Sequence, residues 1–379
     1  MTKYKNLPDS EDHLFPLEPR YHPVNRIMRR IYDFFASTKL AMALLVTILI
    51  SCIIGVTIFR EARAEALIFN SLWFNGLLVL LVVNVACCFF GRIWHRKLTI
   101  ITFGMILFHL SFVAMLGGII YNSLFYFRGT IRLTEGETLP NGQPQSYDKI
   151  ESGRFFNHSR LKGELTLLKM HMDYKVKGDD KRAAYDIEVG EGKSKKQGIV
   201  YVTHNLDYNG FTYLPDKEGY SLLVILSDKQ GREMAGAHIP LQSLRQKDNS
   251  FLYTTGTKEG PGSFPFPQGP EKPLFYLQVA YKPSQLKERG GDAIFRIWPT
   301  ATMEMKHDGA KPLVEGKTAI GEKFDTDGYY LSAKEVRYWV GMTVRYEPGK
   351  PIILASLWIA LAGMVITTFG RMFKKGGKR

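Results

Sequence analysis

The chain has 379 residues, of which 45% are hydrophobic and 23% are charged. The formal net charge is +14 at pH 7, yet residues 122–349 contribute only +3 of it, with 32 basic and 29 acidic residues. The other basic residues flank long apolar runs, so the excess charge indicates membrane topology and argues against a nucleic-acid partner.

Four uncharged apolar runs of 20 to 24 residues define the organisation of the chain: 40–59, 71–91, 98–121 and 351–370. At ~1.5 Å of rise per residue, a helix of this length crosses a hydrocarbon core ~30 Å thick. We therefore expect an integral membrane protein with four transmembrane helices, three near the N-terminus and one near the C-terminus. The polar leader before them, residues 1–39, places the first run too far from Met1 for a cleaved signal peptide.

The basic residues predict the orientation of these helices. They lie in the leader, in the turn between the second and third runs (Arg92, Arg96 and Lys97) and in the basic tail, residues 371–379. Because positively charged flanks stay in the cytoplasm, both termini are expected there. The segment 125–350 would then lie on the extracytoplasmic, periplasmic side of the cell (inner) membrane.

Polar and small residues inside the runs indicate how the helices pack. Asn75 and Asn84 in the second run are candidates for interhelical hydrogen bonds, and Gly118 and Gly363 offer surfaces for close helix contact. All three cysteines, Cys52, Cys87 and Cys88, fall inside the runs. Adjacent residues on a helix point about 100° apart, so we expect Cys87 and Cys88 to be buried small hydrophobic residues rather than a disulfide.

His109 lies near the middle of the run 98–121, which contains no Asp, Glu, Lys or Arg. An ionisable side chain at that depth is costly and usually has a partner. Neutral imidazole is a natural axial ligand of haem iron, although it can also simply donate a hydrogen bond to a helix carbonyl. The other three runs contain no histidine. If His109 binds iron, the second ligand must come from another subunit, a different residue type or a site near the surface.

Between the third and fourth runs the pattern changes to short alternating segments separated by turns, as in Tyr208-Asn209-Gly210. We expect a large all-β domain over 125–350, sandwich- or barrel-like, with room for two sub-sheets and one short helical piece near Leu241–Arg245. Six segments read as strands: 163–174, 198–204, 220–227, 274–281, 301–307 and 336–346. The segment Gly190–Ser194 only superficially resembles a phosphate loop and is expected to be a hairpin turn.

Several segments together resemble one known family. They are Phe35–Ala41 with Gly55, Trp73-Phe74 with Leu77-Leu78 and Asn84–Cys88, His109–Gly118, Phe127-Arg128-Gly129 with Glu135-Gly136-Glu137, and Tyr346-Glu347-Pro348-Gly349. In this combination the chain resembles the ResB family of cytochrome c biogenesis, part of the machinery called System II. It departs from the family at Thr203–Leu206, where a proline is missing before the Tyr-x-Gly element.

The resemblance implies a required, non-catalytic subunit of a haem-attachment complex. Such a subunit works with a polytopic ResC-like partner to move haem across the membrane and present it to apocytochrome c. His109 matches the family's third-helix histidine, which implies an axial ligand of a transient haem b shared with the partner. A thioredoxin-like reductant of the apocytochrome thiols is a further implied partner.

Two other functions remain open at this point. One is a b-type haem membrane anchor for electron transfer, which needs a second ligand at matching depth. The other is an envelope interaction or sensor protein with a β domain and no cofactor. No Cys-x-x-Cys-His sequence occurs, so the chain is not itself a c-type cytochrome.

Overall fold

The computed structural model describes residues 23–59, 62–93, 98–176, 178–245, 251–257, 260–268, 272–284, 289–300, 311–326 and 328–376. The chain divides into two compact units. The helical unit comprises Met1–Ser123 and Gly349–Arg379, and the β unit comprises Leu124–Pro348.

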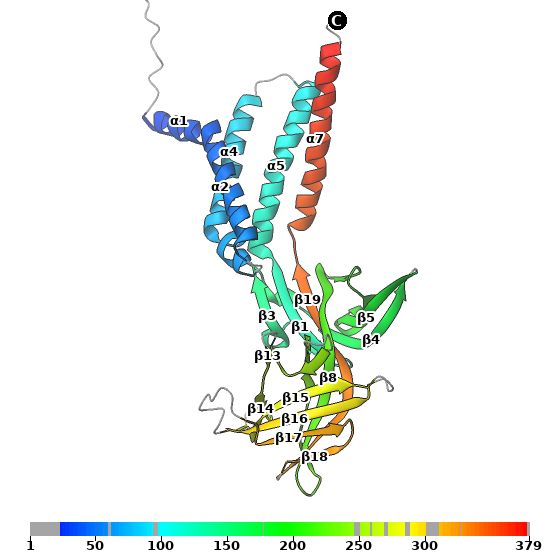
Figure 1. Cartoon of the computed structure of the whole chain (residues 1–379). Coiled ribbons are helices and arrows are strands. Elements are labelled where there is room, and N and C mark those ends of the chain that lie inside the picture. Colours follow the sequence, from blue (N-terminus) through cyan, green and yellow to red (C-terminus); the bar gives the residue numbers. More distant parts are fainter. Residues whose placement is uncertain are drawn as a thin grey trace, which may run out of the picture. The chain divides into compact units, whose positions relative to one another are not determined.

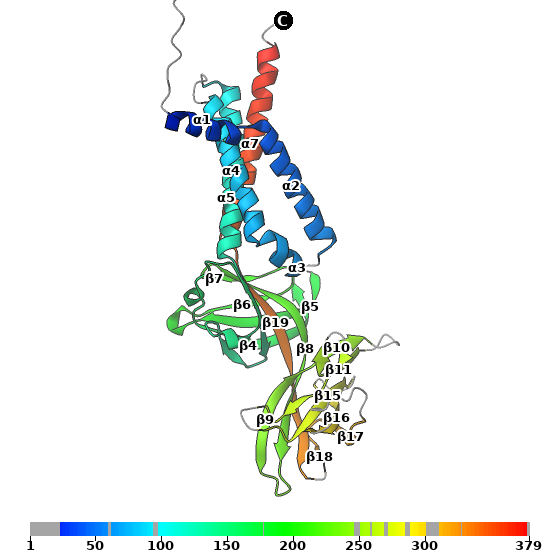
Figure 2. The same ribbon diagram turned by 90° about the vertical axis from the view of Figure 1, so that its left-hand side faces the viewer.

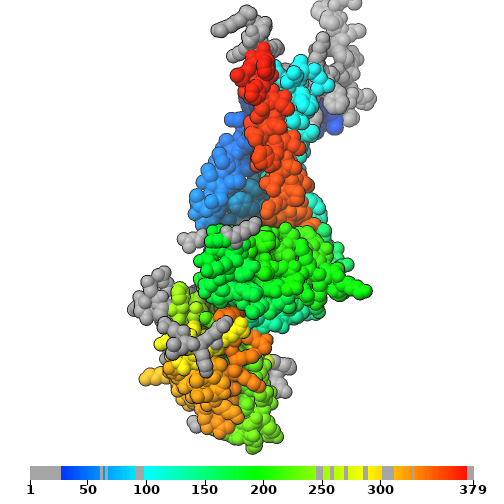
Figure 3. All heavy atoms as spheres, turned by 90° about the vertical axis from the view of Figure 1, so that its right-hand side faces the viewer, coloured from blue at the N-terminus to red at the C-terminus, as the bar shows by residue number. Residues whose placement is uncertain are grey.

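Four helices of the structure are long and apolar enough to cross a membrane. They are α2 (Thr38–Thr57), α4 (Leu72–Ile93), α5 (Ile100–Phe125) and α7 (Lys350–Gly376). Shorter helical segments are α1 (Pro23–Phe35), α3 (Ala62–Ala64) and the π-helical turn η1 (Glu65–Phe69). The expected four spans are thereby confirmed. The leader contains the unexpected α1, and α7 continues six residues beyond the expected end of the last span. Figure 3 shows α7 uncovered along one face. Trp358 of this helix is 70% exposed, as a lipid-facing side chain would be.

Helices α5 and α7 approach closely at glycines. A Cβ atom on Gly104 would lie 2.8 Å from the carbonyl oxygen of Gly363, and one on Gly118 would lie 3.0 Å from Cγ1 of Ile353. The prediction of small packing surfaces is confirmed for Gly118 and Gly363. A Cβ atom on the adjacent Gly117 would meet no described atom of another helix within 4 Å. Without a hydrophobic force between helices in lipid, such backbone contact supplies much of the association.

The two asparagines of α4 bind other helices, as expected. The Nδ2 atom of the fully buried Asn84 donates hydrogen bonds to the carbonyl oxygens of Phe35, at 2.6 Å, and Ser37, at 3.1 Å. These carbonyls belong to the junction of α1 and α2: Phe35 ends α1, where carbonyls lack intrahelical partners, and Ser37 caps the start of α2. The Nδ2 atom of Asn75 donates to Oγ of Ser123 in α5 at 2.9 Å.

The β unit consists of antiparallel sheets (Figure 1). Its strands are β1 (Phe127–Thr134), β2 (Thr138–Pro140), β3 (Tyr147–Ser152), β4 (Glu164–Val176), β5 (Asp179–Gly190), β6 (Lys196–Val200), β7 (Leu206–Tyr208), β8 (Phe211–Ser227), β9 (Glu233–Pro240), β10 (Gln242–Arg245), β11 (Phe251–Thr254), β12 (Gly256–Thr257), β13 (Gly260–Pro261), β14 (Phe264–Phe266), β15 (Phe275–Pro283), β16 (Gly291–Pro299), β17 (Val314–Ala319), β18 (Lys323–Asp325) and β19 (Tyr330–Tyr346). Short 3-10 turns are η2 (Pro144–Ser146), η3 (His158–Arg160) and η4 (Gly192–Ser194).

The largest sheet has seven strands in the order β3-β1-β19-β8-β7, with β18 beside β19 and β9 beside β8. A six-stranded sheet is ordered β10-β11-β15-β16-β17 with β14 beside β15, a four-stranded sheet is ordered β2-β4-β5-β6, and β12 pairs with β13. The all-β architecture expected from the alternating pattern is confirmed.

The β unit has two hydrophobic cores that share the strands β8 and β19. The first core also draws on β1, β4 and β5, and the second on β15 and β16. A bulge at Lys334 interrupts the pairing of β19 with β8. Leu331 and Ala333 before it and Val336 after it are buried in the same core. Because the bulge inserts one residue, these inward positions change from odd to even numbers while the same side of the strand keeps facing this core.

Three local expectations can be compared with the structure. Gln242–Arg245 is not helical but pairs with Phe251–Thr254 as a strand, because a partner later in the chain satisfies its backbone. The expected hairpin turn after Gly190 is confirmed, since η4 joins the paired strands β5 and β6. The expected strand at 301–307 lies outside the described residues.

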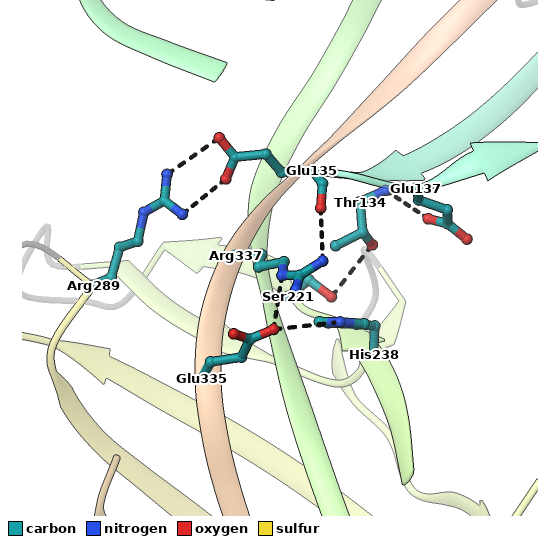
Figure 4. Close-up of polar contacts among 8 residues, drawn as sticks. All are labelled: Thr134, Glu135, Glu137, Ser221, His238, Arg289, Glu335 and Arg337. Atoms are coloured by element: carbon teal, nitrogen blue, oxygen red, sulfur yellow. Dashed lines mark hydrogen bonds and ion pairs between the residues drawn. The ribbon is translucent and has the colours of Figure 1, made fainter. Parts of the chain in front are cut away.

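A chain of ion pairs joins segments of the two cores (Figure 4). The buried carboxylate of Glu135, just after β1, lies 2.9 Å from the guanidinium of Arg289, between β15 and β16. Its other oxygen accepts a hydrogen bond from the backbone N–H of Met170 in β4. Arg337 of β19 donates to the carbonyl oxygen of Glu135 and lies 2.7 Å from Glu335. We call Glu135, Arg289, Glu335 and Arg337 the inter-core clasp.

We predict that Gly104→Ala lowers the stability of the helical unit. The added methyl group would overlap backbone atoms of α7, which cannot move aside, and overpacking of this kind costs about 1–3 kcal/mol. Thermal unfolding of the full-length protein in detergent measures the effect. Gly117→Ala is the matched control, because alanine there meets no neighbour and has the better helix propensity. Equal melting temperatures for the two variants would contradict the packing argument.

We also predict that His238, beside the clasp, makes the β unit less stable in acid. Burial first, and then the charge of Arg337, lower the pKa of His238 below its ordinary 6.5, while Glu335 and Glu137 oppose the shift. The stabilisation from the neutral ring is complete above this value and is lost as the pH falls through the lower pKa of the folded protein.

The measurement is the melting temperature of the full-length protein between about pH 8 and about pH 5. His238→Gln should flatten the acid side of the curve, whereas His158→Gln, at an exposed ring, should leave it unchanged. If the melting temperature of His238→Gln depended on pH in the same way as that of the wild type, the role of His238 would be refuted.

Candidate functional site

His109 is the tenth residue of α5, in its first half, and its side chain is half-buried. Apolar residues and a few uncharged polar ones make up the helix from Ile100 to Phe125. The structure therefore places the imidazole within a membrane-spanning helix, as the sequence predicts.

A hydrogen bond within α5 determines which nitrogen of His109 carries the proton. The Nδ1 atom lies 2.8 Å from the carbonyl oxygen of Met105, one helical turn earlier. A carbonyl oxygen can only accept, so Nδ1 is the protonated nitrogen and donates. The neutral ring then has its lone pair on Nε2, which has no hydrogen-bond partner among the residues that the structure describes.

Aromatic rings from two helices hold the imidazole in place. The ring of Phe89 in α4 stacks on His109 with a centroid distance of 4.0 Å and an interplanar angle of 12°. The ring of Phe108 packs against the imidazole in a T-shaped arrangement, with a centroid distance of 5.3 Å and an interplanar angle of 85°. Sequence analysis missed Phe89, because hydropathy alone does not show which side of α4 faces α5.

The three cysteines are free thiols and half-buried, and the structure shows no disulfide between Cys87 and Cys88. Near them, the Cys87 carbonyl oxygen accepts a hydrogen bond from the Tyr32 hydroxyl at 3.0 Å, and Cys88 Sγ lies 4.0 Å from the carbonyl oxygen of Phe35. Both contacts tie α4 to α1.

By itself His109 offers one nitrogen donor and not a complete metal site. Within the described ranges, no group of three or more His, Cys, Asp or Glu side chains is placed to hold a metal ion. A haem iron needs only axial ligands from the protein, because the porphyrin provides the others. The fixed tautomer, the unpartnered Nε2 atom and the apolar surroundings all fit one such ligand.

The β unit contains a cleft of about 520 Å³ between β5, β8, β10 and β19. On its wall, the Tyr185 hydroxyl donates a hydrogen bond to Glu218, which also pairs with Arg182 at 2.8 Å. Burial first, and then Glu218, raise the pKa of Tyr185, so the phenol stays protonated. Glu218 is therefore committed to these two contacts. The inter-core clasp is likewise a set of mutually paired charges.

Comparison with known proteins places the whole arrangement in a family. No curated protein matches the chain. The model of the ResB-like family matches residues 97–372, which include α5 with His109, the entire β unit and nearly all of α7. From this match over most of its length, together with four spanning helices around an all-β unit, the chain belongs to the ResB-like family, which is associated with cytochrome c biogenesis.

Proposed function

We propose that this protein is a non-catalytic, required subunit of a cytochrome c haem-attachment complex. It works with a ResC-like polytopic partner to move haem across the cell (inner) membrane and present it to apocytochrome c. His109 supplies one axial ligand to a haem b that is held transiently and shared with the partner. The family membership supports the biological process, and the geometry of His109 supports its part in it.

The observation that carries the proposal is the hydrogen bond from Nδ1 of His109 to the Met105 carbonyl oxygen. This bond keeps the lone pair on Nε2, the atom that must coordinate iron, and it prevents the ring from rotating its protonated nitrogen into that position. When bound, haem would supply the iron centre and the porphyrin that is attached to the apocytochrome. The protein's own task is to hold, orient and release it.

Incomplete ligation suits a transfer role. Spans α2, α4 and α7 contain no histidine, so a bis-histidine site at the depth of His109 needs an imidazole from outside these spans, such as one from a partner. A site divided between two proteins can open when they separate, which allows haem to leave without unfolding either one. A b-type electron-transfer anchor would instead keep its haem through two ligands of its own.

We further propose that the β unit faces the extracytoplasmic side, with both termini in the cytoplasm. The basic residues around the apolar runs favour this orientation. There the β unit would position apocytochrome c or brace the ResC-like partner, while a thioredoxin-like reductant keeps the apocytochrome thiols reduced.

His109→Ala should greatly reduce the haem that copurifies with the complex of this chain and its ResC-like partner. The cause is loss of one axial ligand, so added imidazole should restore part of the haem spectrum. Absorption spectra of the purified complex and pyridine-haemochrome content measure the effect. Cytochrome c maturation in the same cells should fall in parallel.

The matched control is His158→Ala, which removes an exposed imidazole from the β unit and should leave the haem content unchanged. Normal haem content and normal maturation in His109→Ala would refute the ligand assignment. Full haem bound by this chain without any partner would favour the electron-transfer anchor.

Phe89→Leu should weaken haem retention without abolishing it. Leucine keeps the apolar volume but removes the stacked ring, which is worth about 0.5–1.5 kcal/mol and corresponds to roughly two- to ten-fold faster haem loss. Haem transfer to apomyoglobin measures the rate, and a shifted low-temperature electron paramagnetic resonance signal would report altered orientation of the imidazole. Phe103→Leu, at an exposed position of α5, is the control. Identical rates and spectra for both variants would contradict a positioning role for Phe89.

A further inference from the structure

The helix α1 is strongly amphipathic, although it precedes the apolar runs. Successive residues of an α-helix are rotated by about 100°. On that rotation Ile27, Met28, Ile31 and Phe34 fall along one side of α1, while Arg29, Arg30 and Asp33 fall along the other. Separate apolar and basic faces in a short helix are typical of segments that lie at a membrane surface.

The apolar side of α1 is exposed in the structure. Ile27 is 59% exposed, Met28 62%, Ile31 47% and Phe34 59%. Four large hydrophobic side chains in one stripe form a patch that a water-exposed helix rarely carries. Large apolar side chains of the next helix, the spanning α2, are exposed as well, for example Met42 at 60%.

Two contacts hold α1 at the end of the helical bundle. The Tyr32 hydroxyl donates a hydrogen bond to the Cys87 carbonyl oxygen, and the buried Asn84 side chain donates to the Phe35 carbonyl oxygen. Only Ala36 and Ser37 separate α1 from α2. In both ribbon views α1 runs across the direction of α2, α4 and α5 (Figures 1 and 2). A helix crossing the spans at their end lies parallel to the membrane plane.

We infer that α1 is an interfacial helix that binds the anionic lipid surface at the N-terminal end of α2. Its apolar stripe enters the boundary between headgroups and acyl chains, and Arg29 and Arg30 contact lipid phosphates. Basic residues close to an anionic leaflet are attracted to it, and the attraction decays within a Debye length. The charges of α1 therefore match the leaflet that basic flanks prefer.

Lipid fits this surface better than a protein partner. A protein groove that received Ile27, Met28, Ile31 and Phe34 would also have to exclude lipid from the exposed apolar side chains of α2, which begins two residues after α1 ends. The membrane covers both sets of side chains at once. The inference does not depend on haem binding, so it can fail while the proposed function stands.

The test places a nitroxide spin label on either side of α1 in the full-length protein. Cys52, Cys87 and Cys88 are first replaced by alanine, and the label is attached through Ile31→Cys or Asp33→Cys. The protein is reconstituted in nanodiscs of phosphatidylcholine alone or of an equal mixture with phosphatidylglycerol. Power saturation compares accessibility to oxygen, which concentrates among acyl chains, with accessibility to a water-soluble nickel chelate.

We expect the label at position 31 to favour oxygen and the label at position 33 to favour the nickel chelate. The preference at position 31 should be stronger in discs that contain phosphatidylglycerol. Reversal of both charges, Arg29→Glu with Arg30→Glu, should abolish that gain, whereas Arg29→Lys with Arg30→Lys should retain it.

Three outcomes would overturn the inference. Equal access of the nickel chelate to both positions would place α1 in water. Low access of both reagents to position 31 in every lipid would show that protein covers the stripe. If the oxygen preference at position 31 were the same in both lipid mixtures and in the charge-reversed variant, binding to anionic lipid would be refuted.

Discussion

Inside a membrane, a polar group must find its partner within the protein, because hydrocarbon offers none. The imidazole of His109 meets this requirement with a carbonyl of its own helix, Met105. That choice has a chemical consequence, since it commits one ring nitrogen to the backbone and leaves the other with a lone pair. Asn84 and Asn75 each donate through their Nδ2 atoms to neighbouring helices and so hold the helical unit together. At His109 the hydrogen bond lies within one helix, and the second ring nitrogen is left as a possible ligand.

The packing around α5 makes this arrangement rigid. Backbone contact between Gly104 and Gly363 brings α7 against one part of α5, and the stacked ring of Phe89 comes from α4. The imidazole is therefore oriented by groups on α4 and α5 of the same chain. The other three spans contain no histidine. Under the proposed function, specificity then depends on a partner whose own ligand has matching geometry.

Sequence reasoning succeeded where the signal is local. The four spans follow from length and apolar character, the packing glycines from their small size, and the asparagine contacts from the cost of an unsatisfied amide in lipid. It failed where the cause lies elsewhere in the chain. Gln242–Arg245 becomes a strand because Phe251–Thr254 pairs with it, and the change from odd to even inward positions along β19 depends on a bulge opposite β8. The helix α1 is not evident from the average composition of the polar leader, because an average hides apolar residues that recur on one side of a helix. The position of His109 was predictable, whereas its stacking on Phe89 required the folded structure.

The pairing of β1 with β19 has a consequence for biosynthesis. Phe127 at the start of β1 pairs with Tyr346 at the end of β19. The first strand to leave the ribosome therefore cannot complete its pairing until the last strand has been synthesised. Both cores include β19, and neither can close until almost the whole segment has been synthesised. During that interval β1 and β8 present open edges that invite aggregation. Chaperones that shield such edges should consequently limit the yield of this protein, and truncations before residue 330 should be degraded rather than partly folded.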